Sequence, residues 1–164
     1  MATQLKNLSD FSASEIPSAE PFRFGIVTAE WNTAITGALY EGAYQSLLGN
    51  GALPDRIFSY TVPGSFELTS GADLLLANGH FDAVICLGCV IQGETRHFDF
   101  ICDAVANGLT SVSIKHNKPV IFGVLTTDNL AQAQDRAGGK HGNKGDEAAV
   151  TAIKMAALAE TLKG

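Results

Sequence analysis

The segment IQGETRHFDF (91–100) combines groups that can bind an anion and move a proton. Gly93 frees the backbone, and Thr95, Arg96 and His97 follow directly before a helical pattern. Backbone N–H groups and a hydroxyl at a helix start suit a small anion. An imidazole titrates near neutrality and can both give and accept protons. We therefore take His97 as the candidate acid–base group, because a merely structural role at a helix start is the weaker interpretation.

Two further segments carry recognition groups. AEWN (29–32) contains the only tryptophan, Trp31, which either belongs to the core or stacks on a flat heterocycle. VPGSFEL (62–68) offers Ser65 and Glu67, which suit the N–H and C=O edges of a ring such as a pyrimidine. On these residues alone the preferred alternative is that Ser65 caps the next helix and Glu67 interacts with its dipole. The segment is not G-x-S-x-G, which excludes a hydrolase nucleophile elbow.

A late glycine-rich segment, RAGGKHGNKGDE (136–147), brings Arg136, Lys144 and Glu147 close together in the chain. Its spacing does not fit G-x-x-x-x-G-K-[ST], so a nucleotide-binding P-loop is excluded. One interpretation is a solvated turn between two helices. The other is an arginine that grips a phosphate, on a neighbouring subunit. Spacing alone leaves both open.

The three cysteines predict neither a disulfide framework nor a metal site. Cys86 and Cys89 lie in the apolar run AVICLGCVI (83–91), and positions three apart in a strand point to opposite faces. We expect them, like small hydrophobic residues, to be buried. No second Cys/His pair completes a zinc site, and we expect no metal and no cofactor.

Composition narrows the class of protein further. The chain has 164 residues, 46% apolar and 17% charged, which predicts one folded domain and excludes intrinsic disorder. A net charge of −6 argues against a general nucleic-acid binder. The longest stretch without Asp, Glu, Lys or Arg, residues 42–54, is too short to span a membrane. The N-terminal residues lack a secretory apolar region and any arginine, so we expect a cytoplasmic protein.

Strands and helices are expected to alternate after a polar tail of residues 1–21, within a single domain of residues 22–164. The predicted strands are Phe22–Thr28, Arg56–Val62, Asp82–Val90 and Pro119–Leu125. The first predicted helix follows a cap at Asn32-Thr33 and ends at Gly49, and the next three are Ser65–Asn78, His97–His116 and Asp128–Arg136. A turn at GGKHGNKG follows, and the last helix runs from a cap at Asn143 to Leu162. Continuous apolar runs indicate parallel strands covered on both faces.

This order predicts a three-layer α/β/α sandwich of the flavodoxin-like kind, with a four-stranded parallel sheet. Ligands of such sheets bind outside the carboxyl ends of the strands. We therefore expect the site among four loops: Ala29–Asn32, Pro63–Glu67, Ile91–His97 and Thr126–Asp128.

Four long motifs closely resemble the lumazine synthase family in order and spacing: FGIVTAEWN, VPGSFEL, GCVIQGETRHFDFI and FGVLTTDNLAQAQDRAGGKHGNKGDEAA. The likeness covers about residues 22–162. It implies a transferase that condenses 5-amino-6-(D-ribitylamino)uracil with 3,4-dihydroxy-2-butanone 4-phosphate. The products would be 6,7-dimethyl-8-ribityllumazine, phosphate and water, in the penultimate step of riboflavin biosynthesis.

The resemblance also implies roles for single residues. His97 matches the proposed proton donor of the family. Positions that contact the pyrimidine or the ribityl chain match Trp31, Ser65, Phe66, Glu67, Cys89, Val90, Ile91 and Phe122, the last usually supplied by an adjacent subunit. Positions at the phosphate match Glu94, Thr95 and Arg136, and two supporting polar positions match Lys144 and Glu147.

Some residues depart from the family pattern. Gln92 stands where Arg or Lys is frequent, Thr69 where Pro is common, and Trp31 where Phe is common. Glu94 adds a carboxylate beside the implied phosphate site, which weakens anion binding unless it turns away. We therefore expect backbone N–H groups, and not the Glu94 side chain, to make that contact.

The resemblance implies homopentamers with active sites at subunit contacts, and in some members twelve pentamers form an icosahedral capsid. The uninterrupted GGKHGNKG resembles capsid-forming members, the tail 1–21 is a candidate for pairing with a neighbour's sheet, and riboflavin synthase is a candidate partner. Two alternatives remain: an archaeal type of riboflavin synthase, and a non-catalytic protein that stores flavin or lumazine. The intact RHFDF and RAGGKHGNKG segments favour lumazine synthase over the first, and His97 with Arg136 favours it over the second.

Overall fold

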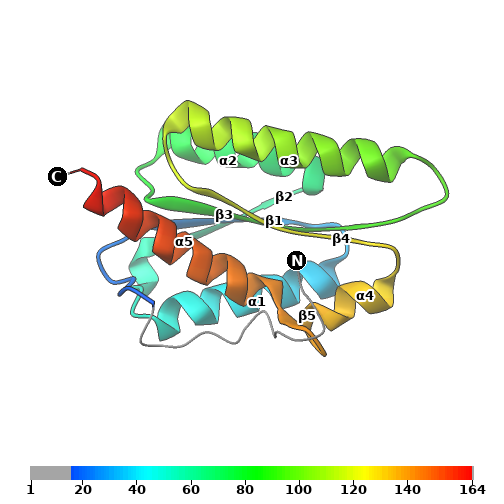
Figure 1. Ribbon diagram of the computed structural model, residues 1–164, viewed down its shortest axis with the longest axis horizontal. Coiled ribbons are helices and arrows are strands. Elements are labelled where there is room, and N and C mark those ends of the chain that lie inside the picture. Colours follow the sequence, from blue (N-terminus) through cyan, green and yellow to red (C-terminus); the bar gives the residue numbers. More distant parts are fainter. Residues whose placement is uncertain (1–15, 164) are drawn as a thin grey trace.

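A four-stranded parallel sheet forms the centre of the computed structural model, which describes residues 16–163 (Figure 1). The strands lie in the order β2 (Ile57–Val62), β1 (Phe24–Ala29), β3 (Ala83–Ile91) and β4 (Val120–Thr127). All three neighbouring pairs are parallel. The chain therefore builds outward from β1 to β2 and then returns to the other side of β1, so strand order reverses between β1 and β3.

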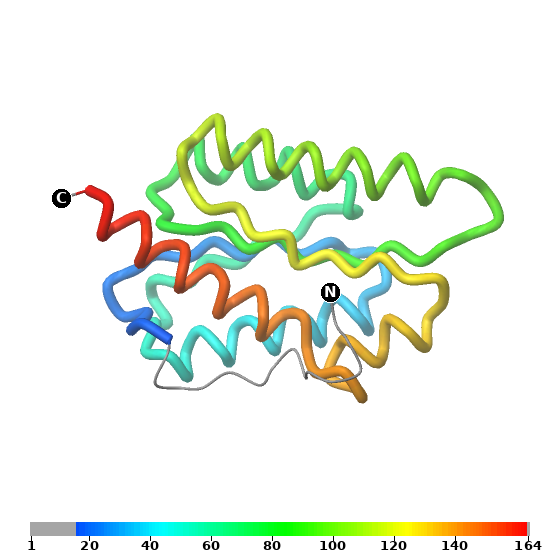
Figure 2. The backbone as a smooth tube through the Cα atoms, in the orientation of Figure 1, coloured from blue at the N-terminus to red at the C-terminus, as the bar shows by residue number. Residues whose placement is uncertain are grey.

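Helices cover both faces of this sheet. α2 (Leu68–Asn78) and α3 (His97–His116) lie on one face, and α1 (Thr33–Gly49), α4 (Leu130–Asp135) and α5 (Lys144–Thr161) lie on the other (Figures 1 and 2). The helices pair within their layers, α1 with α5 and α2 with α3. The predicted three-layer sandwich is confirmed.

Two buried clusters fill the spaces above and below the sheet, and β3 contributes to both. Ile85 and Cys89 belong to the cluster under α1 and α5, whereas Val84 and Cys86 belong to the one under α2 and α3. The prediction that the two thiols face opposite sides is confirmed. Burial raises the pKa of Cys86 to about 12 and that of Cys89 to about 11. Both thiols are therefore protonated at neutral pH and make poor nucleophiles or metal ligands.

Two segments differ from the elements expected for them, and the remaining boundaries differ by at most two residues. The second helix was expected to begin at Ser65, but Ser65–Glu67 forms a short 3₁₀ turn, η3, and α2 begins after it. The simple turn expected at GGKHGNKG is instead a small antiparallel hairpin of β5 (Ala137–Gly139) and β6 (Gly142–Asn143). Gly138 and Gly142 have φ angles of 100° and 80°, which a tight hairpin needs and which glycine adopts without steric cost.

The two expected asparagine caps behave differently. Asn143 accepts a hydrogen bond from Gly145 N at 2.8 Å with its side-chain oxygen, as predicted for the start of α5. Asn32 is the N-cap residue of α1, as predicted, but its side chain makes no capping hydrogen bond there. Its left-handed backbone turns the side chain toward β3, where it donates to the Cys89 carbonyl.

Residues 16–21, the last part of the expected tail, pack against the domain. Ile16 lies on the core cluster of α1 and α5, and Ala19 N donates to Asn50 O at 2.9 Å. The Arg56 guanidinium holds the chain by donating to Pro21 O at 2.9 Å. Residues 1–15, the part of the tail expected to pair with a neighbour, lie outside the described residues. Within residues 16–163, no helix is both long and apolar enough to cross a membrane.

Candidate functional site

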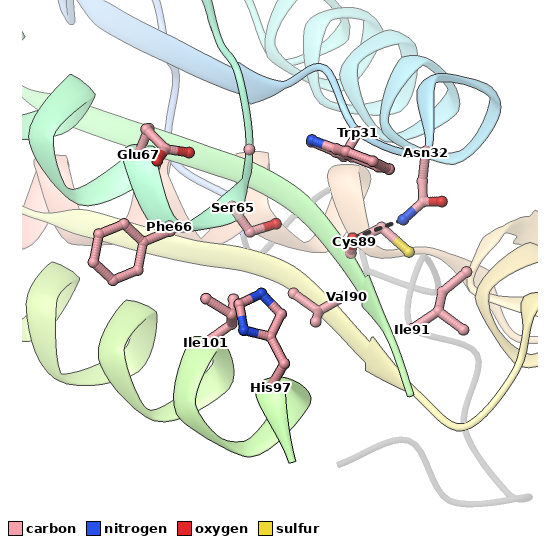
Figure 3. Close-up of a pocket in the computed structure, with 11 residues that line it drawn as sticks. Trp31, Asn32, Ser65, Phe66, Glu67, Cys89, Val90, Ile91, His97 and Ile101 are labelled. Atoms are coloured by element: carbon pink, nitrogen blue, oxygen red, sulfur yellow. Dashed lines mark hydrogen bonds between the residues drawn. The ribbon is translucent and has the colours of Figure 1, made fainter. Parts of the chain in front are cut away.

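An open cleft of about 680 Å³ lies where the carboxyl ends of β1, β2 and β3 meet the start of α3 (Figure 3). It coincides with the point where strand order reverses, the place at which ligands of such sheets bind. Its lining residues are Trp31, Asn32, Gly64, Ser65, Phe66, Glu67, Cys89, Val90, Ile91, His97 and Ile101. Three of the four loops expected to hold the site contribute, and the Thr126–Asp128 loop does not.

The cleft exists because β1 stops before β3 does. Pairing between β1 and β3 ends at Thr28 and Leu87, whereas pairing between β3 and β4 continues to Ile91 and Thr127. Gln92 N still donates to Thr127 O at 2.8 Å. The last residues of β3 are therefore bonded on the β4 side and present an open backbone edge to the cleft.

Trp31 stands at the mouth of this cleft, with 72% of its surface exposed. The interpretation of Trp31 as a core residue is therefore wrong, and its ring is free to cover a flat ligand. Gly64 lies beside it. A Cβ atom there would come within 3.4 Å of the Trp31 Cδ1 and 3.1 Å of Glu67 Oε2, so a side chain at this position would crowd both the indole and the carboxylate.

Ser65 and Glu67 face the cleft and not the helix that follows them. Neither side chain caps η3 or α2, which contradicts the alternative interpretation of Ser65 as a cap. Ser65 is buried against Gly88 of β3, where a Cβ atom would come within 2.6 Å of the Ser65 hydroxyl. The Glu67 carboxylate forms no ion pair with any residue in 16–163, so it can accept hydrogen bonds from a ligand.

His97 begins α3 on the side of the cleft opposite Trp31, as Figure 3 shows. Its backbone N–H donates to the Thr95 hydroxyl at 3.4 Å, which helps to anchor this helix start. Val90 and Ile101 flank the imidazole, and the ring pairs with no carboxylate of the described chain. The arrangement leaves both ring nitrogens available to a ligand.

Six predicted site residues do not line this cleft. Phe122, on the edge strand β4, lines a separate hollow of about 280 Å³ together with Lys144 and Glu147 of α5. Lys144 Nζ pairs with Glu147 Oε1 at 2.8 Å, while Glu147 Oε2 is buried and has no hydrogen-bond partner among residues 16–163. Arg136 is half-buried at the end of α4, and its carbonyl accepts from Lys144 N at 2.9 Å.

Glu94 and Thr95 are exposed in the loop between β3 and α3 and do not line the cleft. Asn32, Gly64 and Ile101 line it and were missed. Ile101 follows His97 by one helical turn, so its position was available from spacing. Asn32 and Gly64 gave no comparable signal, because their roles depend on contacts between distant segments.

Residues 16–163 contain no group of three or more His, Cys, Asp or Glu side chains that could hold a metal ion. The cleft itself offers an aromatic plane, one carboxylate, one imidazole and a backbone edge. These groups can bind a planar polar ring and transfer protons around it.

Comparisons with known proteins identify the family of the chain. The family model described as 6,7-dimethyl-8-ribityllumazine synthase matches residues 21–160. A 6,7-dimethyl-8-ribityllumazine synthase of Cytophaga hutchinsonii is 62% identical over 99% of this chain and 100% of its own. Proteins of the same name from Flavobacterium johnsoniae and Phocaeicola vulgatus are 53% and 50% identical, covering 95% and 99% of this chain and 82% and 97% of their own. The chain therefore belongs to the 6,7-dimethyl-8-ribityllumazine synthase family.

Proposed function

We propose that this cleft is where the chain, a transferase of riboflavin biosynthesis, condenses 5-amino-6-(D-ribitylamino)uracil with 3,4-dihydroxy-2-butanone 4-phosphate. The products are 6,7-dimethyl-8-ribityllumazine, phosphate and water. One observation carries the assignment to the cleft: Trp31, Glu67 and His97 converge on it from three different segments of the chain.

The pyrimidine substrate is flat and displays N–H and C=O groups along its edge. Its face suits the exposed indole of Trp31, and its edge suits the open backbone of β3 and the unpaired Glu67 carboxylate. The ribityl chain then runs toward Ser65 and Phe66, which line the same cleft. This orientation presents the reactive amine toward the His97 side.

The reaction needs proton transfers at several steps: imine formation, phosphate loss, tautomerisation and ring closure. His97 is the group that transfers these protons, because an imidazole can both give and accept them, whereas burial raises the pKa of the Cys89 thiol to about 11. Acid–base help of this kind contributes roughly 10²–10⁴-fold. Orienting two substrates can contribute about 7–11 kcal/mol, so we expect orientation to be the larger effect.

The phosphate of the four-carbon substrate binds at the start of α3, where Thr95 and backbone N–H groups lie close to His97. Glu94 contributes its backbone and not its exposed carboxylate. Arg136 supplies the positive charge from an adjacent copy of the chain.

The adjacent copy also supplies Phe122, Lys144 and Glu147. Two observations support this composite site. These residues lie outside the cleft of their own chain, and the cleft rim leaves Trp31 and Phe66 exposed by 72% and 55%, an apolar surface that a second copy would cover. We expect the chains to form pentamers in the cytoplasm. We also expect the pentamers to assemble into an icosahedral capsid and to associate with riboflavin synthase.

The activity is tested by incubating the purified protein with both substrates and following lumazine fluorescence together with phosphate release. We expect both signals to rise in step. An archaeal type of riboflavin synthase would consume lumazine instead, and a storage protein would bind lumazine or flavin without releasing phosphate. Either result would overturn the proposal.

The composite site is tested by co-expressing His97→Ala and Arg136→Ala chains. Each variant alone loses most activity, but in mixed rings some sites join an intact cleft to an intact Arg136. Random mixing should restore about a quarter of the wild-type activity, since heterologous contacts place each cleft against one neighbour. If the mixture were no more active than the average of the two variants, both groups would belong to one chain.

A further inference from the structure

Asn32 has a backbone conformation that few residues adopt. Its φ and ψ are 60° and 48°, in the left-handed region, and within residues 16–163 Asn117 is the one other non-glycine residue there. Asparagine tolerates this region better than most side chains. The conformation lets the chain turn sharply between the end of β1 and the start of α1.

The Asn32 side chain bridges two strands that have stopped pairing. Its Nδ2 donates to Cys89 O at 3.0 Å, across 57 positions of the sequence. Backbone pairing between β1 and β3 has already ended at Thr28 and Leu87. The side-chain amide thus makes one more cross-strand hydrogen bond where the two backbones have separated.

The same residue also holds the start of α1. Asn32 O accepts from Ile35 N at 2.8 Å and from Thr36 N at 3.0 Å. One asparagine therefore ties together the end of β1, the end of β3 and the first turn of α1. Trp31, its neighbour in the chain, is exposed by 72% and has little packing of its own to hold it.

From these contacts we infer that Asn32 is a positioning residue, which sets the distance between the Trp31 indole and the open edge of β3. This spacing is the width available to a planar substrate, so the inference rests on the function proposed above. Asn32 acts through Trp31 and Cys89 and takes no part in proton transfer. The hydrogen bond occupies the Cys89 carbonyl and so leaves the end of β3, at Ile91, as the part of the edge open to a ligand.

Two substitutions at Asn32 separate the effect of its side-chain amide from the effect of its left-handed backbone conformation. Asn32→Gly keeps the left-handed conformation and removes the donor. Asn32→Asp keeps a similar shape but places a carboxylate, which cannot donate, against the Cys89 carbonyl. Asn117→Gly and Asn117→Asp are matched controls, because Asn117 has the same backbone conformation beyond the far end of α3.

We expect both Asn32 variants to raise KM for the pyrimidine substrate about tenfold, the effect of one lost hydrogen bond, and to change kcat less than threefold. The fluorescence anisotropy of the single tryptophan should fall in the free variants, and the Asn117 controls should match the wild type in both measurements. Thermal melts report whether each variant is folded, and Asn32→Gly decides the question if Asn32→Asp does not fold.

Wild-type KM and anisotropy in Asn32→Gly would overturn the inference, and so would equal changes in the Asn117 controls. The anisotropy needs no substrate. A wild-type protein that makes no lumazine would therefore refute the proposed function, while the anisotropy comparison would still decide whether Asn32 positions Trp31.

Discussion

Gly145, at the start of α5, lies directly against the backbone carbonyl of Leu39 in α1, with no space for a side chain between them. A Cβ atom at Gly145 would overlap Leu39 O, and neither backbone can move without disturbing the buried α1–α5 contact. We expect Gly145→Ala to lower the free energy of unfolding by about 3 kcal/mol or more, measured by urea denaturation.

The matched control is Gly37→Ala in α1, where an added Cβ atom meets nothing within 4 Å. Alanine favours a helix over glycine by up to about 1 kcal/mol, so this change should stabilise the protein slightly. Equal effects of the two substitutions would contradict the close approach of α1 and α5.

Trp31→Ala should raise KM for the pyrimidine substrate about 10- to 100-fold, because stacking of a base on an aromatic ring contributes about 1–3 kcal/mol. Trp31→Phe should restore most of the affinity, since a smaller ring still covers the substrate face. Steady-state kinetics with the other substrate saturating provide the measurement. An unchanged KM in Trp31→Ala would show that the indole does not stack on the pyrimidine substrate.

His97→Ala should slow kcat about 10²–10⁴-fold without abolishing turnover, because acid–base help of that size is lost while substrate orientation remains. Single-turnover measurements with a folded variant check this. A decrease in kcat beyond about a million-fold would show that proton transfer contributes more to the rate than the orientation of the substrates does. His80→Ala is a suitable control, because His80 lines a different hollow.

Asp73 links α2 to the end of α3. Its carboxylate accepts hydrogen bonds from Lys115 Nζ at 2.8 Å and from His116 Nε2 at 2.7 Å, and these contacts lower the pKa of Asp73 below its ordinary 3.8. A lowered pKa in the folded state adds stability above pH 4 that is lost as pH falls through the folded value.

We therefore expect Asp73→Asn to be less stable than wild type at pH 7, by less than about 1 kcal/mol because the pair is partly exposed, and the difference to narrow as pH falls below 4. Urea denaturation at pH 7 and at a series of lower pH values measures it, with Asp103→Asn as a control without an ion pair in residues 16–163. A difference that does not narrow as pH falls would contradict this account.

Thiol labelling should distinguish the three cysteines. Burial raises the pKa of Cys86 and of Cys89, and both are shielded, so neither should react with a thiol reagent at pH 8 in the folded protein. Cys102 is half-buried, and burial together with Asp103 and Asp99 raises its pKa, so it should react slowly. Peptide mass spectrometry identifies the labelled residue, and labelling of Cys86 before unfolding would contradict its burial.

Much of the fold could be predicted because its signals are local. The apolar run of β3 indicated a strand buried on both faces, and Asn143 with its following carboxylates indicated the start of α5. Ligands of parallel sheets bind at the carboxyl ends of the strands, and three of the four loops selected on that ground line the cleft.

Contacts between distant segments were beyond this reasoning. Asn32 has the residue type of a helix cap, but a carbonyl 57 positions away in the sequence takes its side chain. Likewise, no pattern in the chain indicated that Gly64 makes room for Trp31 and Glu67. The hairpin of β5 and β6 depends on positive φ angles at two glycines. A glycine can adopt such an angle, but its presence in the sequence does not predict that it will.

Phe122, Lys144 and Glu147 stand around one hollow, while Trp31 and His97 face another. Under the proposed arrangement, a monomer would be folded but unable to turn over substrate. Each subunit would have a complete active site only in the closed ring. Specific activity would then depend on protein concentration, because dilution would dissociate the ring and abolish activity without unfolding the chains.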